Sequence, residues 1–155
     1  MTATNHALTG AILGLAVGNP WVALPAAFVS HFVCDAIPHY DVSHGSNEEK
    51  IASRTFFYVQ IVGGLIGCVA LVAVLVISQP AHWLLACICA FLAASPDLLA
   101  IPRFQSVKRG GKDLLDRWWF WRFHHNIQWF QKPIGWPVEL AWFAGALILI
   151  RPFMI

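Results

Sequence analysis

The most constraining feature of this 155-residue chain is an apolar segment, residues 55–77, that contains no charged side chain. A helix needs about 20 apolar residues to cross the hydrocarbon core of a bilayer, and this segment is long enough. Only 12% of all residues are charged and the mean hydropathy is +0.62, whereas soluble domains carry about 25% charged residues. The chain is therefore predicted to be an integral membrane protein. A disordered chain, an ordinary soluble enzyme and a basic nucleic-acid binder are excluded, and no nucleic-acid partner is expected.

Other apolar stretches complete the predicted helices. The first 37 residues are apolar but contain the turn sequence Gly18-Asn19-Pro20, which predicts a hairpin of two short helices. No basic residue precedes this hairpin, so we expect a retained segment rather than a cleaved signal peptide. The fold class expected is all-α, a polytopic membrane helical bundle forming a single domain over residues 1–155. Its helices are expected at about 4–17, 20–37, 55–77, 81–101 and 134–150.

Residues 114–131 combine many aromatic side chains with Arg117 and Arg122. Amphipathic aromatic rings favour the headgroup level of a bilayer, so this segment is predicted to be an interfacial helix. Every Lys and Arg except Arg151 lies in residues 38–54 or 102–133. Five crossings place these two segments and the N-terminus on one side, which the positive-inside rule assigns to the cytoplasm. We expect a multi-pass protein of the inner membrane, with the lipid bilayer as its partner.

Imidazoles and carboxylates gather near the predicted cytoplasmic boundary. Several of them continue stripes of small residues spaced four apart, and small residues mark the faces on which membrane helices pack. Gly10 and Gly14 follow His6 in this spacing, and Ala27 precedes His31. The side chains are therefore expected to point into one common pocket. The residues concerned are His6, His31, Asp35, His39, Asp41, Asp97, His124 and His125.

Neutral imidazole and ionised carboxylate are typical ligands of divalent zinc, iron and manganese. The metal ligands predicted are His6, His31, Asp35, His39, Asp41, Asp97 and His124. Zinc is the first choice, with manganese or iron as alternatives, and more than four ligands suggest two ions. Glu139, about one turn inside the last span, and His125, beside His124, are predicted to act in catalysis by moving protons.

Purely structural roles compete with this interpretation. His6 can be a packing or capping residue, His31 and Asp35 an internal hydrogen-bonded pair, and Asp97 the cap of a broken helix. His44 and His82 lie in polar or interfacial settings and are taken as bystanders. The four cysteines lie in apolar stretches without a C-x-x-C pair, so they are expected to be buried thiols rather than disulfides.

One combination of motifs is more specific. Ser30-His31-x-x-x-Asp35-x-x-Pro38-His39-x-Asp41, followed later by Ser95-Pro96-Asp97, resembles the membrane-bound, metal-dependent hydrolases described as LexA-binding, inner-membrane-associated proteins of bacteria. The resemblance implies that His6, His31, Asp35 and Asp97 are metal ligands. It also implies that His39 and Asp41 are ligands or close neighbours of the metal.

The function expected is a metal-dependent hydrolase at the cytoplasmic membrane interface, acting on a small-molecule, phosphorylated or lipid-like substrate. A metal or proton transporter and a non-catalytic scaffold stabilised by metal are the alternatives. A phosphatase with a nucleophilic histidine is disfavoured because no Lys or Arg precedes Lys50 to bind phosphate. A site-2-type zinc protease is disfavoured because H-E-x-x-H is absent from the sequence.

Overall fold

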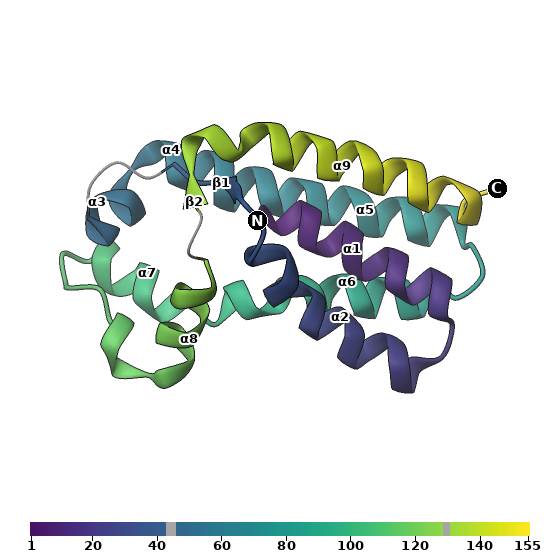
Figure 1. The fold of residues 1–155 in the computed structure, drawn as a ribbon, viewed down its shortest axis with the longest axis horizontal. Helices are drawn as coiled ribbons and strands as arrows, with labels where there is room; N and C mark the ends of the chain where they lie inside the picture. Colours follow the sequence, from purple (N-terminus) through teal and green to yellow (C-terminus); the bar gives the residue numbers. More distant parts are fainter. Residues whose placement is uncertain (43–45, 129–130) are drawn as a thin grey trace.

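A computed structural model describes residues 1–42, 46–128 and 131–155. His44, Trp129 and Phe130 lie outside the described residues. The described chain is mostly helical, which agrees with the predicted all-α class (Figure 1). Its principal helices are α1 (Ala3–Val17), α2 (Pro20–Asp35), α5 (Gly64–Ser78), α6 (Trp83–Leu98) and α9 (Trp136–Ile150). Shorter helices and turns are α3 (Asn47–Ala52), α4 (Arg54–Phe56), α7 (Ile101–Lys108), α8 (Trp119–Ile127), η1 (Phe57–Gly63), η2 (Leu115–Arg117), η3 (Pro133–Gly135) and η4 (Arg151–Phe153).

Helix α1 is the centre of the bundle and packs against α2, α5, α6 and α9. Figure 1 shows these helices running side by side, with α3, α7 and α8 grouped at one end. The stripe of small residues on α1 faces α6, as its spacing predicts. A Cβ atom on Gly14 would lie 2.6 Å from Ala86 Cα, and one on Gly10 would overlap the carbonyl of Cys89. The glycines therefore allow the two helices to approach at backbone distance.

In the part of the chain that the structure describes, two helices are long and apolar enough to cross a membrane, Arg54–Ser78 and Trp136–Phe153, and a third if α6 and α7 form one bent span. Arg54–Ser78 agrees with the span predicted at 55–77, although η1 within it is a π-helix. The hairpin helices α1 and α2 have only 15 and 16 residues. By length and composition, five full crossings are therefore not found among the described residues.

The helix predicted at 81–101 ends earlier, at Leu98, and the chain turns by 41° into α7. Pro96 has no amide hydrogen to donate to the Leu92 carbonyl, which accepts from the Ser95 hydroxyl at 2.9 Å instead. The side-chain hydrogen bond that replaces the missing backbone bond lies less than one turn before the end of the helix. The helix therefore continues through Ser95-Pro96-Asp97, where the sequence predicts an interruption, and breaks just after it, at Leu99-Ala100. The separate helix that follows was not predicted.

Three further features differ from the prediction. The aromatic helix expected over 114–131 is shorter, because η2 and the extended residue Trp118 precede α8. Between the helices predicted at 20–37 and 55–77, where no helix is expected, the chain forms α3, which begins with a capping box made by Ser46 and Glu49. A two-residue parallel pairing of β1 (His39–Tyr40) with β2 (Gln131–Lys132) was not predicted, and it joins the segment after α2 to the segment before α9.

Candidate metal centre

Four of the predicted ligands come together in the structure: His31, Asp35, Asp97 and His124. One ligand atom from each lies within 4.8 Å of every other, so the group could hold a metal ion. His31 and Asp35 are one turn apart at the end of α2, while Asp97 comes from the end of α6 and His124 from α8. Three helices from distant parts of the chain thus supply the site.

The distances in this group approach those of a coordination shell. The Nε2 atoms of His31 and His124 are 2.9 Å apart, and Asp35 Oδ2 is 3.2 Å from the first and 2.9 Å from the second. Asp97 Oδ1 lies farther out, at 3.8 and 3.9 Å from the same nitrogens. Tetrahedral zinc with Zn–N bonds of about 2.0–2.1 Å separates its ligand atoms by about 3.3 Å. Small outward shifts of the inner three side chains and an inward shift of Asp97 therefore suffice to enclose an ion.

The orientation of His31 is set by its second ring nitrogen. Nδ1 lies 2.8 Å from the carbonyl oxygen of Ala93, and since a carbonyl can only accept, Nδ1 carries the hydrogen. In the neutral form of the ring, Nε2 then presents a lone pair to the group. Metal-binding histidines usually have this arrangement, with the outer ring nitrogen donating to a carbonyl or a carboxylate.

The group is buried on one side and open on the other. His31 and Asp35 are inaccessible to solvent and His124 is nearly so, whereas the side chain of Asp97 is 37% exposed. Gln128 donates from Nε2 to Asp35 Oδ2 at 2.8 Å, one helical turn after His124. The i, i+4 spacing of His124 and Gln128 on a predicted helix is a signal that could have identified Gln128 from the sequence.

His6 lies beside the group rather than within it. Its ring stacks on the ring of His31 with centroids 4.1 Å apart, and its Nε2 is 3.0 Å from Asp35 Oδ1. The amino group of Met1 also donates to Asp35 Oδ1. The two carboxylate oxygens of Asp35 therefore have different partners: Oδ2 faces His31 and His124, and Oδ1 faces His6 and Met1.

His39 and Asp41 do not belong to the group of four. His39 donates from Nδ1 to the carbonyl of Ile37 at 2.7 Å, and its buried Nε2 has no hydrogen-bond partner within the described ranges. Burial and the nearby Met1 amino group lower the pKa of His39, so the ring is neutral. Asp41 forms an ion pair with Lys50 at 2.7 Å.

The two residues predicted to move protons have different positions. Glu139 accepts hydrogen bonds from the Thr2 amide and hydroxyl, at 3.0 Å each, and from the Asn5 side chain at 2.6 Å. It therefore holds the start of α1 and makes no hydrogen bond to the four-residue group. His125 lines a cavity that Asp97 also lines. Partial burial and the nearby cations Arg103 and Lys50 lower the pKa of His125.

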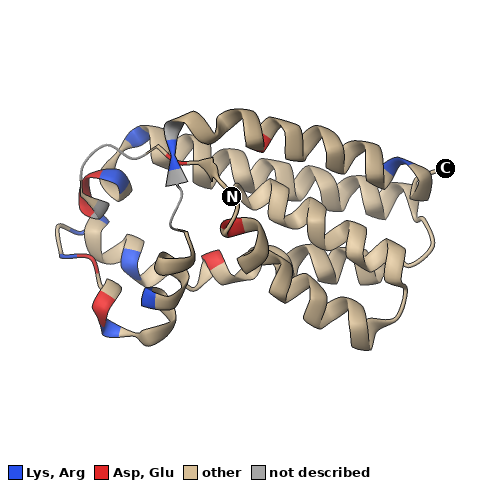
Figure 2. Ribbon diagram, viewed as in Figure 1, with Lys and Arg blue, Asp and Glu red and all other residues tan. Residues whose placement is uncertain are grey.

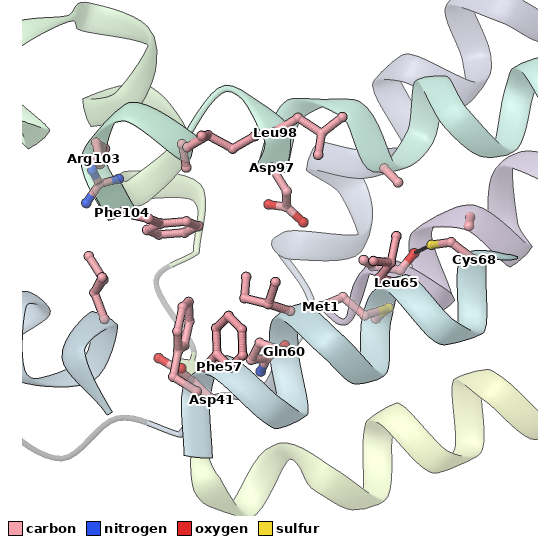
Figure 3. A pocket seen from close by; sticks show the side chains of 18 of the residues that line it. Met1, Asp41, Phe57, Gln60, Leu65, Cys68, Asp97, Leu98, Arg103 and Phe104 are labelled. Atoms are coloured by element: carbon pink, nitrogen blue, oxygen red, sulfur yellow. Dashed lines mark hydrogen bonds between the residues drawn. The ribbon is translucent and has the colours of Figure 1, made fainter. Parts of the chain in front are cut away.

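This cavity has a volume of about 860 Å³ and lies between η1 and α5 on one side and α6 and α7 on the other. Figure 3 shows the carboxylate of Asp97 pointing from α6 across the space towards Gln60 and Leu65. His39 and Gln128 also line the cavity. The exposed edge of the candidate metal centre therefore opens into a space large enough for a small molecule.

Comparison of the chain with protein-family models, with curated proteins and with solved structures finds no match.

Proposed function

We propose that this protein is a metal-dependent hydrolase embedded in the bacterial inner membrane, with zinc held by His31, Asp35, Asp97 and His124. The observation that carries this proposal is the meeting of two imidazoles and two carboxylates from three helices within 4.8 Å. The tautomer of His31 and the cavity beside Asp97 add support, because a catalytic metal needs both oriented ligands and an open side. The resemblance of the motifs to the inner-membrane hydrolase family points to the same reaction class.

When bound, the ion supplies Lewis acidity: it acidifies a water molecule and draws electrons from the bond to be cleaved. In hydrolysis the water oxygen bonds to the central atom of the ester and the bond to the leaving oxygen breaks. The proton lost by the water ends on that leaving oxygen. His125 is suited to transfer it, because the ring lines the same cavity as Asp97 and its lowered pKa keeps it neutral near pH 7.

One ion per chain is the stoichiometry that the contacts favour. A second ion on Asp35 Oδ1 would have to displace the Met1 amino group, which occupies that oxygen together with His6. His6 is therefore assigned to positioning Asp35. Glu139 is assigned to positioning α1, through Thr2 and Asn5.

The cytoplasmic orientation of the centre is part of the proposal. Charged residues gather at the end of the bundle where α3, α7 and α8 lie, and the long helices are almost free of charge (Figure 2). An excess of Lys and Arg marks cytoplasmic segments. The exposed rings of Trp119 and Phe123 on α8 would then lie at headgroup level beside the centre.

Metal analysis of protein purified without chelator tests the proposal. We expect one zinc per chain in the wild type and in the control His82→Ala, whose exposed ring is outside the group. We expect no zinc in His124→Ala, and loss of ester hydrolysis with it. Wild-type protein that binds no divalent metal would overturn the proposal. Metal flux into proteoliposomes without ester hydrolysis would replace the hydrolase by a transporter.

A further inference from the structure

We infer that the substrate is an amphiphile with a phosphate head, which enters the cavity sideways from the bilayer between α5 and α6. This inference names the substrate class of the proposed hydrolase and therefore rests on that function. It is carried by the division of the cavity into an exposed apolar part and a basic part that meet at Asp97.

The apolar part is a surface that a soluble substrate would leave uncovered. Leu65 and Val69 of α5 are 63% and 60% exposed, and Phe91 of α6, across the cavity, is 61% exposed. All three belong to helices that the proposal places in the membrane, so the open edge of the cavity faces lipid. An alkyl chain from the bilayer can lie along this edge without passing through water.

The basic part lies where α7 and α3 approach each other. Lys50, Arg103 and Lys108 line it, and Figure 3 shows Arg103 on the same wall as Asp97 and Phe104. Arg103 is held by Asp113 through two hydrogen bonds of 2.7 and 2.8 Å. Lys50 is paired with Asp41.

The third basic residue of the cavity, Lys108, contacts uncharged groups. Its ammonium donates to the Ala52 carbonyl at 3.0 Å and lies 6.0 Å from the centre of the Phe57 ring. Within the described parts of the chain it has no carboxylate partner at salt-bridge distance. A phosphate in the basic part of the cavity would balance the charge of Lys108, and phosphate is a strong acceptor for lysine.

An unpaired buried atom also points to a polar ligand. Nε2 of His39 has no partner in the described structure, and His39 lines the cavity. Because its Nδ1 donates to Ile37, Nε2 is an acceptor. A buried polar atom without a partner costs free energy, and the P–OH group of a phosphate monoanion would remove that cost.

The helix wall opposite Asp97 is irregular at the same level. Residues Phe57–Gly63 form a π-helix, and within it Phe57, Gln60 and Ile61 line the cavity. Short π segments inside α-helices occur often at functional sites, because the extra residue per turn re-aims the side chains. Here the irregular turn lies where the apolar part gives way to the basic part.

Binding is the sharpest test, since it does not require turnover. Zinc-loaded protein in phosphatidylcholine nanodiscs is titrated with phosphatidic acid, with diacylglycerol and with glycerol 3-phosphate. We expect saturable binding of phosphatidic acid alone, weakened about tenfold or more in Lys108→Gln by loss of a charge-assisted contact. Lys112→Gln, whose side chain lies outside the cavity lining, is the matched control and should bind like the wild type.

The apolar part is tested by filling it. Val69→Trp should weaken phosphatidic acid binding, whereas Ile77→Trp should not, because Ile77 is on the same helix, 82% exposed, and does not line the cavity. The zinc content of all four variants should equal that of the wild type. That measurement separates this inference from the proposed function, which fails if zinc itself is absent.

Two results would overturn the inference. Equal affinity for glycerol 3-phosphate and phosphatidic acid would show that the site takes a soluble phosphate ester. Binding of diacylglycerol as tight as that of phosphatidic acid would show that the basic part does not select a phosphate head.

Discussion

The Nε2 atoms of His31 and His124 face each other at 2.9 Å, although 93 positions separate the two residues in the chain. Nδ1 of His31 donates to Ala93, so two nitrogens this close need a hydrogen or a cation between them. Zinc should therefore stabilise the fold as well as bind to it. At a free concentration 100 times the dissociation constant, the gain is about 2.7 kcal/mol. Thermal unfolding of purified protein with zinc or with chelator measures it, and His31→Ala should remove the difference.

Asp35 and Asp97 should differ in what their loss does to the fold. Asp35 is buried and accepts from Met1 and Gln128, so Asp35→Asn leaves the buried Met1 amino group without its counter-charge. We expect a loss of about 3–5 kcal/mol. Asp97 is partly exposed, and its Oδ1 lies 3.8 Å from the nearer imidazole nitrogen of the group. Asp97→Asn should therefore weaken zinc binding and leave the melting temperature in chelator unchanged, and equal destabilisation by both variants would contradict the arrangement.

Glu139 should act through α1 rather than in the reaction. Glu139→Gln turns an amide hydrogen-bond donor towards Thr2 and Asn5, which donate to the carboxylate. We expect a loss of about 1–3 kcal/mol of stability with the zinc content and the pH profile of hydrolysis unchanged. A zinc-loaded variant of normal stability that no longer hydrolyses esters would restore the catalytic role predicted from the sequence.

Gly14 and Gly145 form a matched pair for the packing of the bundle. A Cβ at Gly14 would lie 2.6 Å from Ala86 Cα, which is backbone and cannot turn away, whereas a Cβ at Gly145 has nothing within 4 Å. Gly14→Ala should destabilise the protein by about 1–3 kcal/mol because α1 and α6 must separate. Gly145→Ala should be neutral or stabilising by up to about 1 kcal/mol, from helix propensity alone. Thermal unfolding of the two variants in one detergent compares them.

The Arg103–Asp113 pair should make the stability of the fold depend on pH in the acidic range. Despite partial burial, hydrogen bonds and charge from Arg103 lower the pKa of Asp113 below its ordinary value of 3.8. A carboxyl whose pKa is lower in the folded state stabilises the fold above its unfolded value, and that contribution falls as the pH drops below about 3.8. We expect about 1 kcal/mol, lost progressively below that pH. Asp113→Asn should show a smaller loss of melting temperature between pH 7 and pH 3 than the wild type does.

Short-range patterns predicted much of this structure. The uncharged run at 55–77 marked the longest helix, and the spacing of Gly10 and Gly14 marked the face of α1 that meets α6. The i, i+4 spacing of His31 and Asp35 placed both side chains on one face of α2. These inferences succeeded because helical periodicity is a local property of the chain.

Relationships over long distances in the chain were harder to predict. Glu139 contacts Thr2, 137 positions away, because α1 and α9 pack together, and no local pattern reports that pairing. The start of α8 depends on the extended conformation of Trp118, and the aromatic composition of the segment does not predict that conformation. The different surroundings of His124 and His125 follow from the rotation of α8 about its axis, which only the docked helix defines.

In the proposed membrane setting, the hairpin of α1 and α2 has a consequence for the surrounding lipid. At 1.5 Å per residue, 15 residues extend about 22 Å, against about 30 Å for the hydrocarbon layer. Lipids bordering the hairpin would then meet an apolar surface several ångströms too short, while those bordering Arg54–Ser78 would not. Such hydrophobic mismatch thins the bilayer locally. Beside the hairpin it would draw headgroups down to the depth of Asp35, at the end of α2.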